Sequence, residues 1–401
     1  MKFSVKPLGV AVLLLLALSA CSSKDEEDDE PTLPEITNKV EPQEVWSSSV
    51  GNGIKHYDVQ LKPAIFDNKV FAASRDGEVA AFDLSNGKEL WSIDLRDGDD
   101  APMFGGLSHW WNGRSAKIGG AVSVGFDKVF VGTEDGLVMA LNPQTGEKIW
   151  SVKIGGEVLA APVAAEGLVL VSTGGGRIFA LQPDTGEQRW MHETENGLLT
   201  LRGISQVAGA NGGVLYGTGN GKVGALISDQ GVPAWEEPIA LAKGATDLAR
   251  IIDVDATPVV HDGKVFAIAY NGQLVALDLR TGRELWKREY ASFRAMALED
   301  NVLYLVDSVG KMYAIDARSG LESWAQLVLH RHFVTAPAVY KKYVVVGDAE
   351  GNLHWFDKTT GEYLARHEFD SSGFYAEAVA TSEYLLLQSR NGEITLLNLP
   401  E

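Results

Sequence analysis

The feature that most constrains the fold of this chain is a hairpin signature that occurs eight times, with a period of roughly forty residues. The clearest copy, VFVGTEDGLVMALNPQTGEKIW, runs from Val129 to Trp150. Its Asp135-Gly136 pair separates two apolar runs, which is a strong hairpin signal because glycine accepts a positive φ. Self-similarity of this kind predicts a propeller or a related repeat array. The turn glycines are Gly77, Gly136, Gly176, Gly221, Gly272, Gly310, Gly351 and Gly392.

Each copy supplies enough strands for one propeller blade. After the hairpin, a second turn at 142–146 leads to a third strand that carries Trp150, and a short strand of small residues, such as 160–165, precedes each copy. The strands read as apolar throughout, which predicts that neighbouring blades cover both of their faces. The sequence therefore predicts an all-β fold, an eight-bladed β-propeller of four-stranded antiparallel blades.

A tryptophan occupies the same offset in the third strand of most copies. An indole repeated in this way predicts a wedge between successive blades, which is a structural role and not a binding role. In the seventh copy the position holds Ala365, so we expect that junction to pack differently. The repeated tryptophans are Trp91, Trp150, Trp190, Trp235, Trp286 and Trp324.

The eighth copy stops at Glu401, one strand short of a complete blade. The segment VWSSSV, Val45–Val50, resembles the missing strand and places Trp46 at the tryptophan offset. The sequence thus predicts a propeller over residues 43–401 whose last blade is closed by the N-terminal strand, leaving no exposed sheet edge.

The first twenty residues have the pattern of a secretory signal, with two lysines before an apolar core. The run Leu18-Ser19-Ala20-Cys21 is a bacterial lipobox, which predicts a signal peptide over 1–20 and lipidation of Cys21; the alternative is an ordinary signal peptide with a chance cysteine. No aspartate follows at Ser22, which favours the outer membrane. The expected location is therefore the periplasmic face of the outer membrane of a Gram-negative bacterium, with the protein held there by its lipid anchor.

Residues 21–42 predict a lipidated cysteine followed by an acidic flexible linker, because they are rich in acids and poor in apolar side chains. The linker contributes to a formal net charge of −19. Such a charge makes nucleic acid an improbable partner.

No motif in the chain indicates a catalytic centre, so the sequence predicts no enzyme, no cofactor and no metal. Cys21 is the single cysteine, and His330 and His332 are the one local pair at strand spacing, without a third ligand. The glycine clusters at 174–176 and 217–221 fall in hairpin turns, where a turn role is favoured over phosphate binding.

The tail of the repeat, as in DLRTGRELW at 278–286, resembles the tryptophan-docking motif of pyrroloquinoline quinone (PQQ) dehydrogenases, which also form eight-bladed propellers. Those enzymes are longer and need calcium and, in many members, a disulfide of adjacent cysteines that this chain cannot make. The resemblance therefore implies a shared fold and not a shared chemistry. A PQQ-dependent dehydrogenase-like or small-ligand-binding propeller is kept as the alternative function.

A second resemblance extends over essentially the whole chain, to the BamB family of outer-membrane lipoproteins. It is carried by LLTLRGISQ at 198–206, RIIDVDATPVV at 250–260, AYNGQLVALDLRTG at 269–282, VVGDAEGNLHWFD at 345–357 and FDSSGF at 369–374. The segment 98–120, with Trp110 and Trp111, has no place in the family pattern. The resemblance implies a non-enzymatic scaffold of the outer-membrane β-barrel assembly complex. Its partners would be the POTRA domains of BamA, the other Bam lipoproteins indirectly, and unfolded outer-membrane proteins as clients.

Two consecutive links between blades, 191–203 and 236–255, are expected to lie side by side on one face, because strand direction reverses at each step of a blade. The first carries Leu199, Leu201 and Arg202, and the second carries Asp253 and Asp255. Leucines beside an arginine suit an exposed apolar anchor with a charged rim. The alternative is that the leucines belong to the core and the aspartates cap turns or pair with Arg202. The resemblance implies that these five residues contact BamA.

Overall fold

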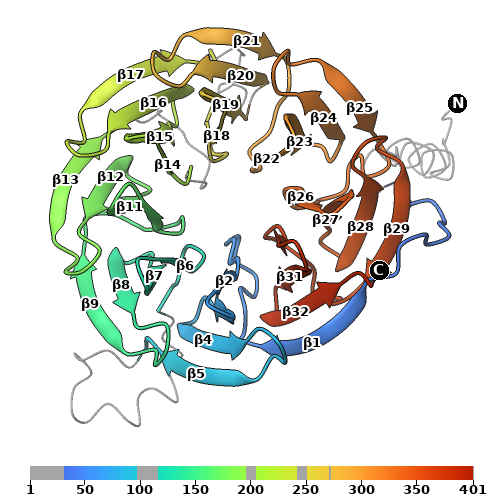
Figure 1. Ribbon diagram of the computed structural model, residues 1–401, viewed down its shortest axis with the longest axis horizontal. Coiled ribbons are helices and arrows are strands. Elements are labelled where there is room, and N and C mark those ends of the chain that lie inside the picture. The colour runs from blue at the N-terminus through green and yellow to red at the C-terminus, as the bar shows by residue number, and fades with distance from the viewer. Residues whose placement is uncertain (1–30, 97–115, 196–204, 242–250, 271, 401) are drawn as a thin grey trace, which may run out of the picture. The chain divides into compact units, whose positions relative to one another are not determined.

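The computed structural model describes residues 31–96, 116–195, 205–241, 251–270 and 272–400. Residues Leu33–Glu401 belong to one compact unit, in which eight four-stranded antiparallel sheets are arranged in a ring (Figure 1). The predicted eight-bladed β-propeller is confirmed. In the part of the chain that the structure describes, no helix has the length and hydropathy needed to cross a membrane.

The strands of each blade follow one another outward from the centre of the ring. Blades 1 to 4 comprise β2 (Ala64–Phe66), β3 (Lys69–Ala73), β4 (Glu78–Asp83) and β5 (Glu89–Asp94); β6 (Ser123–Gly125), β7 (Lys128–Gly132), β8 (Leu137–Leu141) and β9 (Lys148–Lys153); β10 (Val163–Ala165), β11 (Leu168–Ser172), β12 (Arg177–Leu181) and β13 (Gln188–Glu193); and β14 (Ala208–Ala210), β15 (Gly213–Gly217), β16 (Lys222–Ile227) and β17 (Pro233–Pro238). Blades 5 to 8 comprise β18 (Val259–His261), β19 (Lys264–Ala269), β20 (Gln273–Asp278) and β21 (Glu284–Arg288); β22 (Ala297–Glu299), β23 (Val302–Val306), β24 (Met312–Asp316) and β25 (Glu322–Gln326); β26 (Ala338–Tyr340), β27 (Tyr343–Gly347), β28 (Asn352–Asp357) and β29 (Tyr363–Glu368); and β30 (Val379–Ala380), β31 (Tyr384–Gln388), β32 (Glu393–Asn398) and β1 (Gln43–Ser49).

The hydrophobic core lies between adjacent blades, because the two middle strands of each blade are buried on both faces. One such layer packs Phe130 and Val138 of blade 2 against Val169 and Phe179 of blade 3. The outermost strands differ from the prediction, since they alternate: Trp150 of β9 is buried while its neighbours are exposed. An outer strand is partly exposed to solvent at the rim of the ring. Only the side chains that point between blades therefore need to be apolar.

The repeated tryptophan joins a blade to the next one at seven of the eight junctions, as predicted. Trp150 Nε1 donates a hydrogen bond to the carbonyl oxygen of Pro183 at 2.8 Å, in the turn of the following blade. The indole covers Gly186, whose φ is +73° and where a Cβ atom would come within 2.7 Å of the ring. Turn glycine and tryptophan are therefore parts of one contact. The same indole-to-carbonyl bond joins Trp46 to Leu84, Trp91 to Pro143, Trp190 to Ser228, Trp235 to Leu279, Trp286 to Ala317 and Trp324 to Lys358.

The junction at Ala365 is packed differently, as predicted, and the chain's own N-terminal segment takes the place of the turn. The Lys39 N–H donates to Leu364 O at 2.9 Å, and Asn38 and Arg366 exchange side-chain and backbone hydrogen bonds. Val40 is buried beside Ala365. The last part of the linker predicted over 21–42 is therefore part of the folded structure, because Asn38 and Lys39 are hydrogen-bonded to blade 7.

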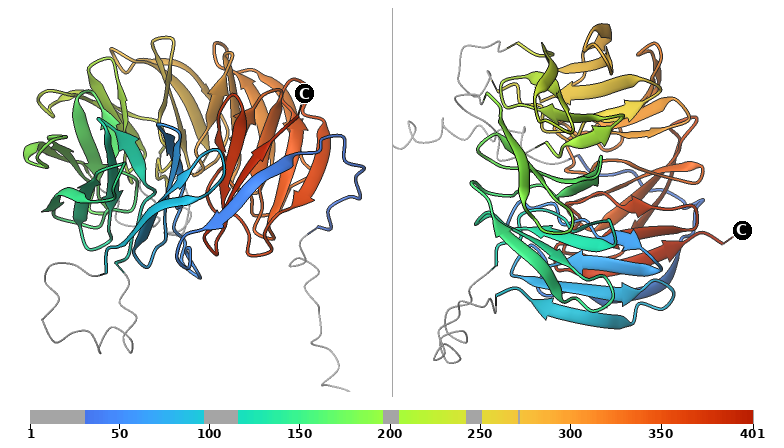
Figure 2. Two further views of the ribbon diagram at one scale, coloured as in Figure 1. Left: turned by 60° about the horizontal axis from the view of Figure 1, so that its bottom comes forward. Right: turned by 60° about the vertical axis from the view of Figure 1, so that its left-hand side comes forward.

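The ring is closed by the N-terminal strand, as predicted. Strand β1 pairs antiparallel with β32, from Gln43 opposite Asn398 to Ser49 opposite Glu393. Figure 2 shows β1, in blue, lying along the strands of the last blade, in red. Strand β32 is thus paired on both sides, and Trp46 docks on blade 1 like the tryptophans of the other blades.

Candidate functional site

One face of the ring carries the links between blades, and we call it the link face. The Thr194 N–H donates to Gly176 O at 2.8 Å and the Ile239 N–H donates to Gly221 O at 2.9 Å. Gly176 and Gly221 are hairpin turns between the second and third strands of blades 3 and 4. The links and these turns therefore share one face, as strand reversal predicts.

The ends of the two predicted partner-binding links lie side by side on this face. The carbonyl oxygen of Ser205 accepts a hydrogen bond from Ser172 Oγ at 3.1 Å, and Ser205 Oγ donates one to the carbonyl oxygen of Ala256 at 3.3 Å. This second contact joins the end of one link to the end of the next. Leu199, Leu201 and Arg202 lie outside the described residues.

Asp253 is a buried residue, only 1% exposed, which corrects its placement in an exposed charged rim. Its carbonyl oxygen accepts the Tyr270 N–H at 2.8 Å, and the next residue, Val254, donates its N–H to Thr218 O at 3.1 Å. The link passes so close to blade 4 that a Cβ on Gly217 would lie 2.2 Å from Val254 O. These contacts tie the link to the hairpin turns of blades 4 and 5 and draw Asp253 inward.

Asp255 lies two residues further on, in the wall of the central cavity. Burial of its carboxyl group, and then the nearby charge of Asp253, raise the pKa of Asp255 to about 7. Both effects disfavour the ionised form. A cation or a hydrogen-bond donor beside Asp255 would favour its ionised form and so offset part of this cost.

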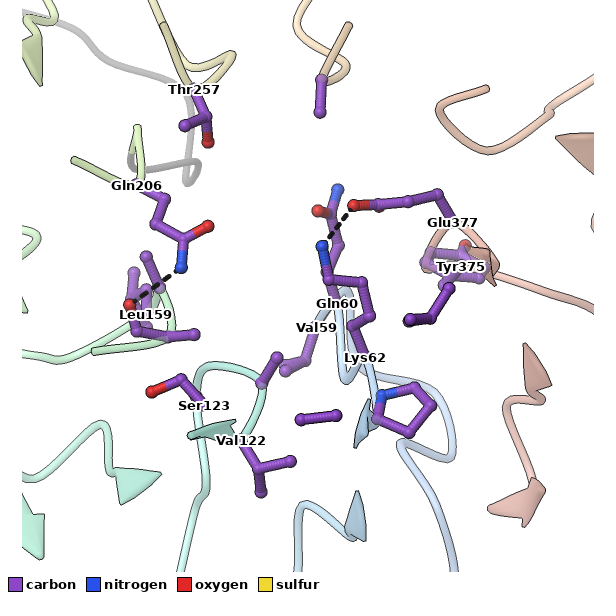
Figure 3. Close-up of a pocket in the computed structure, with 18 of the residues that line it drawn as sticks. Val59, Gln60, Lys62, Val122, Ser123, Leu159, Gln206, Thr257, Tyr375 and Glu377 are labelled. Carbon is purple, nitrogen blue, oxygen red and sulfur yellow. Dashed lines mark hydrogen bonds and ion pairs between the residues drawn. The ribbon is translucent and has the colours of Figure 1, made fainter. Parts of the chain in front are cut away.

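The centre of the ring holds a cavity of about 1070 Å³. Its walls come from the segments that lead into the inner strands, including Val59 and Lys62 before β2, Val122 before β6, and Gln206 before β14 (Figure 3). Because the blades approach one another closely here, most side chains of these segments are small or apolar. The cavity therefore combines apolar walls with a few polar groups that point inward, which is the composition of a ligand site.

Two ion pairs neutralise part of the charge around the cavity. Lys62 Nζ lies 2.8 Å from Glu377 Oε1, as Figure 3 shows, and Arg75 Nη2 lies 2.8 Å from Glu134 Oε1. Burial would raise the pKa of Glu377, but the charge and the hydrogen bond of Lys62 outweigh it and hold that pKa below its ordinary value.

Arginines stacked on aromatic rings edge the cavity on the link face. The Arg75 guanidinium lies 3.6 Å from the centre of the Tyr57 ring, and that of Arg390 lies 4.7 Å from the centre of the Tyr375 ring. Arg294 is buried and lies 4.5 Å from the centre of the Phe293 ring. These distances are within the range of cation–π contacts. Sequence reasoning missed the set, although Arg75 and Arg390 stand at the same offset before the turns SRDG and SRNG.

The remaining candidates from the sequence acquire no site from the structure. Within the described ranges, no group of three or more His, Cys, Asp or Glu could hold a metal ion, His330 and His332 included. Cys21, Trp110 and Trp111 lie outside the described residues.

Fold and site together define an eight-bladed β-propeller with tryptophan-docked blades, a link face and a central cavity. A family model described as "Outer membrane protein assembly factor BamB" matches residues 38–116 and 75–326. A protein of this name from Yersinia pestis is 40% identical over 97% of this chain and 98% of its own length, and one from Escherichia coli is 39% identical over 96% of each. The chain belongs to the BamB family.

Solved structures show the same architecture. The crystal structure of BamB from Moraxella catarrhalis is similar to this chain, with a TM-score of 0.77 and 24% sequence identity. The match covers 89% of this chain and 100% of the Moraxella chain. A europium-containing methanol dehydrogenase gives a TM-score of 0.71 at 14% identity, with 89% and 93% coverage. At these identities the likeness concerns the fold alone.

Proposed function

We propose that this protein is a non-enzymatic scaffold for the assembly of β-barrel proteins in the outer membrane. The observation that carries the proposal is the end-to-end similarity, 40% over 97% of the chain, to a protein named as an outer-membrane protein assembly factor. The ring supports such a role because its tryptophan-docked blades hold the described ends of two links on one face.

The proposed partner is BamA, bound through its periplasmic POTRA domains, with the other Bam lipoproteins held indirectly and unfolded outer-membrane proteins as clients. The proposed contact surface consists of Leu199, Leu201, Arg202 and Asp255. Buried Asp253 supports the surface from beneath, since the backbone on either side of it is bonded to blades 4 and 5. The hydrogen bond between Ser205 and Ala256, which joins the ends of the two links, supports a contact surface that spans both.

The proposed location is the periplasmic face of the outer membrane, with Cys21 carrying the lipid. The names of the relatives support the outer membrane, and the lipobox before Cys21 supports the anchor. Docking of residues 38–40 on blade 7 means that the tether would leave the propeller at that blade.

Co-purification with BamA from solubilised outer membranes tests the proposal. We expect Leu201→Ala and Arg202→Ala to reduce the recovery of BamA at least tenfold, as loss of an interface anchor does. Asp229→Asn, an exposed change in a turn between β16 and β17, is the matched control and should recover BamA normally. Normal recovery with both link variants would overturn the contact surface, and absence of BamA with the parent chain would overturn the scaffold role.

A further inference from the structure

The central cavity is large enough to hold a ligand. Its volume of about 1070 Å³ is at the upper end of the range for ligand sites, roughly 300–1000 Å³. Its walls are mostly apolar, with Val59, Leu159 and Phe333 among them, and the side-chain amides of Gln60 and Gln206 supply hydrogen-bonding groups. These are the features of a site for an elongated molecule with an apolar stem.

The charges in the wall indicate the sign of such a molecule. Glu377 and Glu134 already have cationic partners, Lys62 and Arg75. Asp58 and Asp255 line the same cavity, and neither forms a salt bridge within the described residues. Among the described residues that line the cavity, Asp58 and Asp255 are therefore the two carboxyl groups without a salt-bridge partner.

The two carboxyl groups stand on opposite sides of the ring. Asp58 precedes β2 of blade 1, and Asp255 precedes β18 of blade 5, four blades away in a ring of eight (Figure 1). Tyr375 lines the cavity near Asp58, and burial, together with the nearby charge of Asp58, raises the pKa of the Tyr375 hydroxyl. Asp255 is more deeply buried than Asp58, so its interaction with a cation would be less screened by water.

We propose that the central cavity binds an elongated organic cation that carries two or more amines on an aliphatic stem. One ammonium group bonds to Asp255, a second reaches toward Asp58, and the stem lies against the apolar walls between them. Asp255 belongs both to this site and to the proposed contact with BamA, whereas Asp58 belongs to this site alone.

Isothermal titration calorimetry of the purified soluble chain at pH 8 tests this site, with spermidine as the probe. We expect one saturable site per chain for spermidine, much weaker binding of the monoamine butylamine, and none of the neutral 1,8-octanediol. Asp255→Asn should weaken the binding of spermidine at least tenfold, which is the effect of losing a hydrogen bond to a buried charged group. Asp58→Asn should weaken it severalfold.

The acidic surface of the protein provides the necessary control. Asp229→Asn removes an exposed carboxylate outside the cavity and should leave spermidine binding unchanged. Only weak binding at many sites, unchanged affinity in Asp58→Asn and Asp255→Asn, or equal binding of octanediol would each overturn the proposal. If Asp255→Asn fails to fold, the Asp58→Asn titration decides.

This result is distinguishable from a failure of the scaffold role, because the titration contains no BamA. Asp58→Asn should lose affinity for spermidine and still recover BamA from membranes. If the parent protein binds spermidine but does not recover BamA, the proposed cavity site is supported and the proposed scaffold role is contradicted.

Discussion

Ala365 on β29 lies directly across the ladder from Trp355 on β28, and both side chains are fully buried. Blades 1–6 have the opposite arrangement, with tryptophan on the outer strand and alanine beside it, as in the pair Trp150 and Ala140. Blade 7 therefore keeps the indole but moves it one strand inward. The reason is that blade 8 closes with β1 and offers no turn glycine for an outer tryptophan to cover.

Trp355→Ala should lower the free energy of unfolding by about 3–5 kcal/mol, the usual cost of removing a large buried aromatic side chain. Restoring the common pattern with Trp355→Ala and Ala365→Trp together should not recover this stability, because residues 38–40 occupy the docking position. Chemical denaturation of the parent, single and double variants measures both effects. Recovery in the double variant would show that the inverted pair is not imposed by closure.

Gly186→Ala should be more damaging than Gly167→Ala, although both glycines have a φ of +73°. Each change imposes the cost of a left-handed backbone, about 1 kcal/mol. At Gly186 the new Cβ also meets the Trp150 ring at 2.7 Å, which should add roughly 1–3 kcal/mol, whereas at Gly167 it meets nothing within 4 Å. Equal melting temperatures for the two variants would contradict the docking role of Trp150.

Three N-terminal truncations separate the tether from the closing strand. Removal of residues 22–32 should leave the melting temperature unchanged. Removal of 22–42 should lower it by a few degrees, since it deletes the hydrogen bonds of Asn38 and Lys39 to blade 7. Removal of 22–50 should lower it by many degrees and promote aggregation, because β32 becomes an exposed edge. Identical stability of the last two proteins would refute closure by β1.

Asp255→Asn should stabilise the protein at pH 8 and have little effect at pH 4. The pKa of Asp255 rises from 3.8 in the unfolded chain to about 7 in the folded one, so the folded state binds more protons between these values. The free energy of unfolding of the parent protein therefore falls as pH rises through that window. The variant has no carboxyl group at this position, so its free energy of unfolding does not fall for this reason. At pH 8 the free energy of unfolding of the variant should exceed that of the parent by about 2 kcal/mol. This is less than the full pKa shift implies, because the carboxyl group is only partly buried. Urea denaturation at both pH values measures it, with Asp229→Asn as the control; a difference that does not vary with pH would contradict the assignment.

Cys21→Ala should abolish lipidation and leave a precursor that keeps its signal segment. Ser22→Asp should move the lipidated protein to the inner-membrane fraction. Metabolic labelling with a radioactive fatty acid, followed by separation of the two membranes, measures both results. Label retained on the Cys21→Ala protein would exclude Cys21 as the lipidated residue.

The sequence was sufficient for the fold because its signals are local and repeated. Gly136 marks a hairpin on its own, and the offset from there to Trp150 fixes the outer strand. Closure by β1 could be predicted for the same reason, since Trp46 repeats the offset. Docking of residues 38–40 could not, because Asn38 and Val40 match no repeat and gain partners only when blade 7 is complete.

The candidate site was predictable only in part. Strand reversal placed the two links on one face, but the burial of Asp253 depends on contacts with Thr218 and Tyr270 in two blades. The cavity and the stacked arginines likewise arise from residues of several blades that meet only in the closed ring. Pairings of this kind leave no local pattern in the chain.

Pairing of β1 with β32 also sets an order of events during biogenesis. The chain is made from its N-terminus, so β1 is synthesised long before β32, its partner in blade 8. During that interval β1 has no partner in its own blade, and contacts so distant in sequence form slowly. A chain interrupted anywhere before β32 cannot close its ring, and it would present unpaired strands of the kind that chaperones and proteases recognise. Ring closure thus acts as a proofreading step that only a full-length chain can pass.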